Sequence, residues 1–367
     1  MIPVSEPSLG PLERSYLLDA FDSGWISSRG EYIGHSEKIL ASVAGTPYAA
    51  VCSNGTTALH LALLAIGIAP GDEVIIPSLT YIATLNALYY VGATPIIVDV
   101  LDDTWCIDPT AVESVITART KAIIAVDLYG QPADYTALAQ VAKQHGLRLI
   151  ADAAESIAGS LHGVPTGALA DVSVFSFFGN KVITSGEGGA VTTASPDIDR
   201  LVRQLRNQGN HPTQRYVHDM IGYNYRMTNL SAAILTAQLE RIDGLVSERR
   251  RVVDTYTSLI GGSNAFRLQE VSPGAVPTPW MISVRITGLD SARRDEVIQR
   301  LGEVGIESRP VFPLIQTMPF VPKEHRRSTP VAELISQEGI SLPTFPQLSD
   351  DTIQMIVDAL HRTLAQI

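Results

Sequence analysis

The 367-residue sequence predicts an α/β fold, with a mostly parallel central sheet and a smaller C-terminal α+β domain. The first observation behind this prediction is an alternation, from about residue 47 to residue 195, of short apolar runs with segments of helical periodicity. Such alternation is typical of parallel strands joined by crossover helices. The second observation is the length of the chain, which exceeds one ordinary domain and favours a large domain beside a smaller one.

Seven apolar runs have the length and composition of strands, at residues 48–52, 73–76, 94–99, 121–126, 147–151, 172–177 and 189–192. Between them, residues 57–66, 80–91 and 134–145 carry apolar side chains at three- and four-residue spacing, which predicts helices. Gly67, Gly92 and Gly146 follow these segments and are suited to end them, because glycine readily adopts the left-handed conformation common after a helix.

The last third of the chain predicts the second domain. A long helix is expected to begin near Asn229 and to continue, after a break around Asp243 and Gly244, toward Leu259. From Gly261 the composition becomes loop-like and proline-rich, ahead of an expected strand at 281–286 and helix at 291–304. We therefore expect an N-terminal arm and large domain over residues 1–260 and a small domain over residues 261–367.

Composition and charge exclude several classes of protein. The net charge of -11 argues against a nucleic acid partner, which would need a basic surface. Residues 1–10 lack a signal-peptide pattern, and no segment approaches the roughly 18 apolar residues of a membrane span, so a cytoplasmic protein with no membrane partner is expected. Cys52 and Cys106 stand outside any Cys-x-x-Cys or Cys/His cluster, so neither a disulfide framework nor a metal site is predicted.

The first candidate motif is the turn Ser-Asn-Gly-Thr-Thr at residues 53–57, between an expected strand and an expected helix. The start of a helix presents unpaired backbone N–H groups and a positive dipole end, and Gly55 allows a ligand to come close. The turn therefore suits a phosphate. An ordinary capped helix start explains the same residues, because Ser, Asn and Thr are favoured there in any case.

The second candidate is Asp152, which follows the apolar run at 147–151. The carboxyl ends of strands in open α/β sheets are where ligands bind. A pyridine nitrogen within about 4 Å of this carboxylate would be attracted by about 4 kcal/mol at an effective dielectric constant near 20, enough to keep the nitrogen protonated. The alternative is a structural role, in which Asp152 caps a following helix.

The third candidate is Lys181, at the end of the run Ser-Val-Phe-Ser-Phe-Phe-Gly-Asn-Lys. Most lysines are solvated surface residues. This lysine follows a strand too apolar to lie at a sheet edge, and a lysine in an apolar pocket can lose its proton and attack a carbonyl. The glycines at 186, 188 and 189 are equally compatible with a bulged hairpin, and they form no dinucleotide-binding pattern.

The fourth candidate is the segment at residues 222–229, ahead of the expected long helix. Thr228 or Asn229 is suited to cap that helix. Asn224 and Arg226 then remain as polar groups in an aromatic loop, where they could meet an anion or simply face solvent.

Together these stretches resemble the sugar aminotransferases of the DegT/StrS family, which share the fold of aspartate aminotransferase, PLP fold type I. The resemblance spans nearly the whole chain, because residues 53–59, 77–81, 152–155, 176–181 and 222–228 match the family's motifs in the family's order. It implies pyridoxal phosphate (PLP) as the cofactor, and an amino group transferred from glutamate to a nucleotide-linked keto-sugar.

The resemblance also implies roles for individual residues. Lys181 would bind the cofactor covalently and then move a proton between the two reacting carbons. Asp152 would pair with the ring nitrogen, Glu155 would lie near the ring, and Tyr81 would stack on the ring face.

Four further residues are implied to hold the phosphate of the cofactor. Gly55, Thr56 and Ser176 would do so within one subunit, and Asn224 would reach it from the neighbouring subunit. A homodimer with shared active sites follows, because each site would be completed across a two-fold interface.

Within the family, residues 23–30, 206–209, 215–219 and 306–310 resemble the branch that aminates C4 of GDP-4-keto-6-deoxy-mannose. This likeness implies that Trp25, His218, Arg226 and Arg309 contact the substrate. Val217 and the segment 311–316, which ends at Gln316, depart from that branch in stretches expected to border the sugar. A dTDP- or UDP-linked keto-sugar, or amination at C3, therefore remains an alternative.

Three other classes compete with a sugar aminotransferase. The dehydratase branch of the same fold has histidine in place of the lysine, so Lys181 argues against it. A non-catalytic regulator would not need every cofactor residue and would be expected to carry a DNA-binding segment or a basic face. An oxidoreductase would be expected to carry the dinucleotide motif that the sequence lacks.

Overall fold

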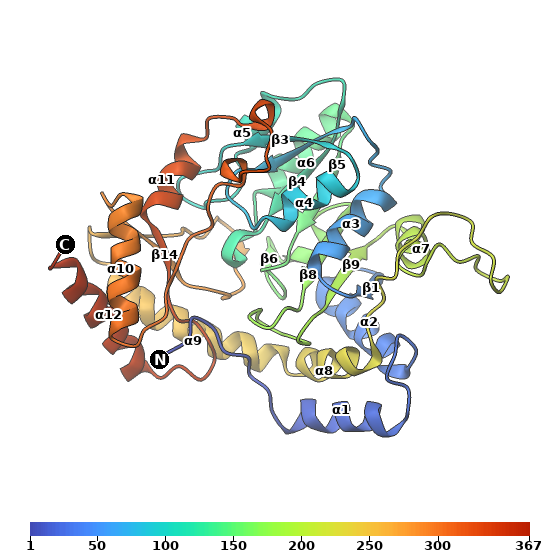
Figure 1. Cartoon of the computed structure of the whole chain (residues 1–367), viewed down its shortest axis with the longest axis horizontal. Coiled ribbons are helices and arrows are strands. Elements are labelled where there is room, and N and C mark those ends of the chain that lie inside the picture. The colour runs from blue at the N-terminus through green and yellow to red at the C-terminus, as the bar shows by residue number, and fades with distance from the viewer.

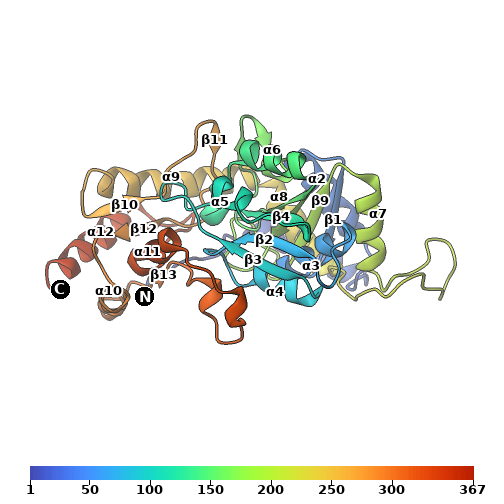
Figure 2. The same cartoon turned by 90° about the horizontal axis from the view of Figure 1, so that it is seen from above.

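The computed structural model describes residues 1–367. Figure 1 shows a large α/β unit built around the central sheet and, at the left, a smaller unit that holds both chain termini. A long pair of helices, α8 (Asn229–Glu240) and α9 (Ile242–Ile260), runs beneath both units and joins them. Figure 2 shows the same two units from above. None of the helices combines the length and apolar character that crossing a bilayer requires.

The central sheet has seven strands in the order β1-β9-β8-β5-β4-β2-β3. The sheet is parallel except at β9, which runs antiparallel to both of its neighbours, β1 and β8. The predicted mostly parallel α/β sheet is therefore confirmed. The bounds of its strands are β1 Tyr48–Cys52, β2 Glu73–Pro77, β3 Thr94–Val98, β4 Thr120–Val126, β5 Arg148–Asp152, β8 Val172–Ser176 and β9 Gly189–Thr193.

Helices cover both faces of this sheet, because successive strand side chains point to opposite faces and each face is apolar. In β2, Ile75 belongs to one core, whereas Val74 and Ile76 belong to the other. The helices of the large unit that contribute most to the first core are α2 (Glu31–Ala44), α5 (Pro109–Glu113), α6 (Tyr135–His145) and α8. Those of the second core are α3 (Gly55–Ala65), α4 (Ala83–Tyr90) and α7 (Pro196–Leu205). Helix α1 (Pro11–Asp22) packs mainly against α8.

The smaller unit has its own four-stranded sheet in the order β10-β12-β14-β13 and a third apolar core. Its elements are β10 Phe266–Leu268, β12 Ser283–Ile286, α10 Ser291–Glu303, β13 Arg309–Pro310, α11 Pro330–Glu338, β14 Gly339–Ser341 and α12 Asp350–Leu364. The third core also contains Val252, Tyr256 and Ile260 of α9. The short strand β11 (Ala275–Val276) pairs instead with β6 (Ser160–Leu161), which pairs with β7 (Val164–Pro165). The boundary at residues 260 and 261 stays a prediction.

Several predicted helix boundaries differ from the structure, and for two of them the contacts give the reason. Helix α4 begins at Ala83 rather than at residue 80, because Thr80 and Tyr81 lie in a turn whose Thr80 hydroxyl bonds the Thr84 hydroxyl, 3.0 Å away. The long helix breaks at Arg241 rather than around Asp243, and the Arg241 side chain donates to Glu13 of α1. The contact with α1 marks the break, and no periodicity in α8 or α9 reveals it.

Candidate active site

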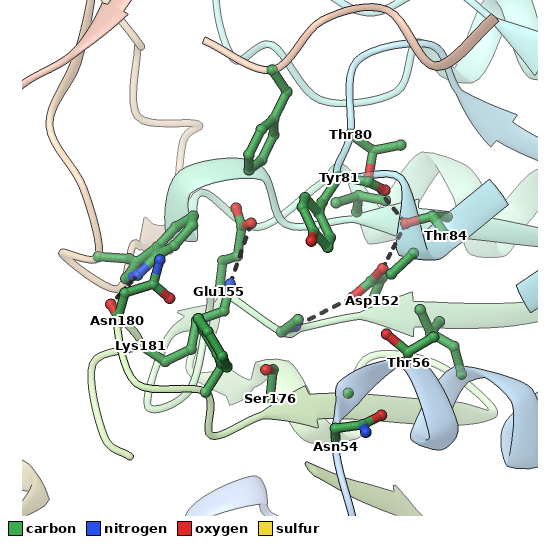
Figure 3. Close-up of a pocket in the computed structure, with 18 of the residues that line it drawn as sticks. Asn54, Thr56, Thr80, Tyr81, Thr84, Asp152, Glu155, Ser176, Asn180 and Lys181 are labelled. Atoms are coloured by element: carbon green, nitrogen blue, oxygen red, sulfur yellow. Dashed lines mark hydrogen bonds and ion pairs between the residues drawn. The ribbon is translucent and has the colours of Figure 1, made fainter. Parts of the chain in front are cut away.

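A pocket of about 480 Å³ lies where the parallel strands end and where the smaller unit meets the sheet. Parallel strands in an open α/β sheet present their carboxyl ends at one edge, and α3 begins at the same edge. The pocket brings together eight of the residues predicted from the sequence: Gly55, Thr56, Tyr81, Asp152, Glu155, Ser176, Lys181 and Arg309. Figure 3 shows Lys181 and Glu155 at the left of this pocket, Asp152 at the right, Tyr81 above and Ser176 with Thr56 below.

The lower wall of the pocket is the start of α3. The Asn54 side chain caps this helix by accepting from the Thr57 backbone N–H at 2.9 Å, which leaves the N–H groups of Gly55 and Thr56 without intrahelical acceptors. A Cβ on Gly55 would lie 2.9 Å from the Cβ of Ser176, so only glycine lets the helix start approach β8 this closely. Backbone N–H groups and two hydroxyls, those of Thr56 and Ser176, therefore converge on one point suited to an anion.

The right wall holds Asp152, the last residue of β5, which is almost fully buried. Its Oδ2 accepts from the Thr84 hydroxyl at 2.9 Å, and its Oδ1 lies 3.4 Å from the backbone N–H of Ala154. Burial raises the pKa of Asp152, and the Thr84 hydrogen bond opposes that effect. No cation lies within ion-pair distance of it, and no helix follows for it to cap, since the next element is β6.

The left wall holds Lys181, whose Nζ lies 3.5 Å from Glu155 Oε1 and 3.7 Å from the ring centroid of Trp280. Burial lowers the pKa of Lys181, while the nearby carboxylates oppose that effect. Burial raises the pKa of Glu155 to about 7, although Lys181 and the hydrogen bond from the Tyr129 N–H both lower it. The two pKa values therefore move toward each other, which suits a lysine that must exist as a neutral amine.

Tyr81 forms the outer wall of the pocket. This residue lies in the turn between β2 and α4, and its side chain is more than half exposed. The Tyr81 ring faces Phe312 of the smaller unit, with 5.7 Å between the ring centroids. An exposed ring beside the cavity can cover a flat ligand.

These groups fit PLP. The cradle at Gly55, Thr56 and Ser176 would hold its phosphate, and the Lys181 amine would meet its aldehyde. Asp152 is a buried carboxylate with a raised pKa and no cationic partner, and a protonated ring nitrogen would supply that partner. The individual roles of these residues toward the cofactor stay predictions.

Asn224 and Arg226 lie outside this pocket. Their segment pairs with the start of the chain's own phosphate turn, because the Ser53 N–H donates to the Tyr225 carbonyl at 2.8 Å. Arg226 donates weakly to Asn224 Oδ1 at 3.4 Å, and its Nε is buried without any hydrogen-bond partner.

Trp25 and His218 also lie outside the pocket. Trp25 is largely exposed between α1 and α2, beside a surface hollow that includes Arg29 and Asn229. His218 lies on the segment between α7 and α8, which projects from the body of the molecule in Figures 1 and 2, and its ring bonds the Gln208 carbonyl at 2.9 Å. Of the predicted substrate residues, only Arg309 lines the pocket.

The segment 311–316, which was expected to border the sugar, meets the pocket at Phe312 and not at Gln316. Gln316 does not border the pocket, because it is buried in a hydrogen-bond network in which it accepts from Ser78 at 2.9 Å and donates to Thr329 at 2.7 Å. Phe312 is the residue of that segment that lines the cavity.

Sequence reasoning missed Thr84, Trp280 and Phe312. Thr84 lies one helical turn beyond Tyr81 and could have been found from that spacing once Tyr81 was placed on the pocket side. Trp280 and Phe312 come from the smaller unit, and only the packing of the two units brings them to Lys181 and Tyr81.

A buried lysine amine and carboxylate, facing an anion-binding helix start in a sheet of this topology, define a PLP enzyme of the aspartate aminotransferase type. The DegT/DnrJ/EryC1/StrS aminotransferase family model matches residues 7–361, and the chain belongs to this family. It is a PLP-dependent sugar aminotransferase, as the sequence predicted.

Individual members support the same assignment. GDP-perosamine synthase of Caulobacter vibrioides is 44% identical over 364 residues, covering 99% of this chain and 98% of that protein. GDP-perosamine synthase of Escherichia coli O157:H7 is 42% identical over 360 residues, covering 98% of each. A Streptococcus pneumoniae protein solved in a PLP form superposes with a TM-score of 0.94 at 28% identity, covering 100% of this chain and 99% of that one.

Proposed function

We propose that this enzyme transfers an amino group from glutamate to the C4 ketone of GDP-4-keto-6-deoxy-mannose, giving GDP-perosamine. The observation that carries the proposal is the full-length similarity to two GDP-perosamine synthases. The stretches around Trp25, His218 and Arg309, which resemble the same branch, support it.

The residues of the pocket supply the chemistry that such a transfer needs. When bound, PLP takes up the amino group and draws electron density from the reacting carbon into its ring. Lys181 holds a proton at Nζ or gives it up, and its lowered pKa keeps part of the amine neutral and able to accept one. Glu155 Oε1, 3.5 Å away, can balance that charge. The carboxylate of Asp152 would pair with the ring nitrogen of PLP and keep it protonated, and the Thr84 hydroxyl orients that carboxylate.

The assignment of Lys181 is tested by peptide mapping. The purified protein should be yellow, and borohydride should bleach its visible band and fix the cofactor covalently on Lys181. Four other lysines, at positions 38, 121, 143 and 323, serve as internal controls in the same digest. Cofactor on one of them, or a protein that binds no cofactor, would contradict the assignment.

The identity of the sugar is tested by steady-state kinetics with glutamate as donor and product mass as the readout. The chemistry at Lys181 is the same for any ketone, so discrimination must come from contacts remote from the reacting carbon. A site that hydrogen-bonds one base rejects a base lacking those groups strongly. We expect GDP-4-keto-6-deoxy-mannose to give a higher kcat/KM than thymidine- or UDP-linked 4-keto or 3-keto sugars. The opposite ranking would refute the GDP assignment and leave the aminotransferase intact.

We further propose that the active enzyme is a homodimer and that Asn224 reaches the cofactor phosphate of the partner. The position of Asn224 outside its own pocket and the unpartnered Nε of Arg226 support this arrangement. Mixing Lys181→Ala with Asn224→Ala protein should form hybrid dimers in which one site carries both lesions and the other carries neither. Activity should then recover in part. No recovery, in a mixture shown to exchange subunits, would argue that Asn224 does not act across the interface.

A further inference from the structure

Trp280, from the segment before β12, lies against the reactive amine of Lys181. It follows the proline-rich segment and precedes β12, and only 3% of it is exposed. The Lys181 Nζ stands 3.7 Å from the centroid of its ring, well within the distance at which a cation is attracted to an aromatic face. Figure 3 shows the Lys181 side chain pointing to Glu155, which completes the surroundings of the amine on the other side.

The indole ring is fixed in this position from three directions. Its Nε1 donates to the Asn180 carbonyl at 2.8 Å, next to Lys181 in the chain. The backbone carbonyl of Trp280 accepts from the Arg249 side chain at 2.8 Å. That fully buried arginine also donates to the Thr344 carbonyl at 2.9 Å. Its ring stacks on Tyr129 at 5.9 Å between centroids and an interplanar angle of 20°. The ring can therefore act as a rigid surface.

We propose that the face of the Trp280 ring is a seat for the Lys181 ammonium group, holding it beside Glu155 whenever the amine is not bound to the cofactor. The proposal rests on the assignment of Lys181 as the reactive amine. An aromatic face attracts the ammonium form of lysine and not the neutral amine. The seat therefore opposes burial, which favours the neutral form, and it returns the freed side chain to one place during each turnover.

Other charged groups also act on this amine. Glu155 and Asp152 face it from the end of β5, and Glu187 and Arg309 line the same pocket. Arg249 reaches only the Lys181 backbone carbonyl, at 3.5 Å. None of these groups depends on the indole ring, so a change of ring at position 280 isolates the contribution of the seat.

The experiment compares Trp280→Met, Trp280→Phe and wild type as full-length, cofactor-free protein. Competitive acetylation with acetic anhydride across a pH series, read by peptide mass, gives the pKa of the Lys181 amine. Methionine is chosen because its long apolar side chain fills space without an aromatic face. We expect Trp280→Met to lower the pKa of Lys181 by about one unit, which is about tenfold faster labelling below the wild-type pKa. Trp280→Phe should give a smaller shift in the same direction.

Two controls separate the seat from general damage. The exposed Lys323 normalises reagent reactivity in every digest, and Trp105→Met removes another buried indole that does not line the pocket. Trp105→Met should leave the Lys181 profile unchanged. An unchanged or raised pKa of Lys181 in Trp280→Met overturns the proposal, and if that variant does not fold, the Phe variant decides by the same criterion. The acetylation experiment contains no sugar, so its result does not depend on the substrate assignment, which the steady-state kinetics test on their own.

Discussion

Two clusters of buried charge in this protein are built in opposite ways. In the pocket, the Lys181 amine and Glu155 are 3.5 Å apart. Where the two units meet, Arg285 of β12 lies 2.8 Å from Glu338 of α11 and also binds Asp102, which follows β3. The first pair is loose and the second is tight, although both lie in the interior.

The difference extends to the remaining hydrogen bonds. The Glu338 carboxylate accepts from two nitrogens of Arg285, at 3.0 and 2.8 Å, and from the Gly288 N–H at 2.8 Å. In the pocket, the Asp152 carboxylate has one good donor, the Thr84 hydroxyl. Burial raises the pKa of both pocket carboxylates, Asp152 and Glu155, because their donors only partly offset it. The comparison teaches that the loosely bonded pocket holds an amine and a carboxylate whose pKa values burial shifts toward each other.

The largest effect is expected from removing the amine at the centre of the pocket cluster. Lys181→Ala should lower turnover by about ten-thousandfold or more, about 5.5 kcal/mol, because it removes both the attacking amine and the proton carrier. Its melting temperature should stay close to wild type, because Glu155 can take up a proton when its cationic partner is absent. Turnover and melting temperature measured on one preparation of the variant check these two expectations. Residual activity above a few per cent would mean that another group carries the proton.

The next largest effect concerns the other side of the pocket. Asp152→Asn should retain the cofactor and lose about a thousandfold in turnover, which corresponds to the roughly 4 kcal/mol expected from one ion pair at an effective dielectric constant near 20. The visible band of the variant controls for cofactor binding. Near-normal turnover would show that Asp152 is structural.

The tight cluster should respond in the opposite manner, with a loss of stability and little loss of turnover. Arg285→Met leaves the Glu338 carboxylate buried without its cation and should lower the free energy of unfolding by about 3 kcal/mol. Below the melting temperature, kcat should change by less than a few-fold, because the cluster lies outside the pocket. Urea unfolding at fixed protein concentration measures the first quantity.

A matched double variant completes that experiment. Arg285→Met combined with Glu338→Leu removes both charges, so most of the lost stability should return. A single variant as stable as wild type, or a double variant as unstable as the single one, would show that this cluster contributes little to folding.

The large unit could be predicted well from the sequence because its signals are local. Strand β1 was expected at residues 48–52 and lies at Tyr48–Cys52, and the other six strands of the central sheet deviate by one residue at either end. A strand buried on both faces of a sheet is a continuous apolar run, so it can be recognised in the sequence without knowing which strands lie beside it. The candidate residues were singled out from local sequence for the same reason: Asp152 ends β5, the turn at 53–57 opens α3, and Lys181 lies in the loop after β8.

Much of the remainder could not be predicted because it depends on distant partners. Helix α1 buries only Glu13 and Ala20, too few positions to give an apolar period. In the smaller unit, the strand expected at 281–286 lies at Ser283–Ile286 and the helix expected at 291–304 lies at Ser291–Glu303. The other three strands of its sheet, β10, β13 and β14, are two or three residues long, below the length at which alternation is visible. Trp280 reaches Lys181, and Asp102 reaches Arg285, only through the packing of the two units.

Asp127 sharpens the comparison, because it is buried like the pocket carboxylates and bonded like the tight cluster. Its carboxylate accepts from the Ala133 N–H at 3.0 Å, from the Tyr135 hydroxyl at 2.8 Å and from Ser156. Burial nevertheless raises the pKa of Asp127 to about 7, above the value near 3.9 of an unfolded chain. The unfolded state therefore loses this proton at lower pH than the folded state does.

The smallest expected effect follows from that difference. Between about pH 4 and pH 7 the folded protein binds more protons at Asp127 than the unfolded chain, so stability should fall as pH rises, by at most about 1.4 kcal/mol per pH unit from this group. Asp127→Asn removes the titration, while its amide can accept from Ala133 and Tyr135 and donate to Ser156. The variant should therefore lose stability less steeply over this range, with turnover within a few-fold of wild type.

Glu155 titrates near the same pH in both proteins, so its contribution cancels in the comparison. Urea unfolding at four or five pH values checks the slopes, and parallel slopes would mean that the three hydrogen bonds outweigh burial and keep Asp127 ionised.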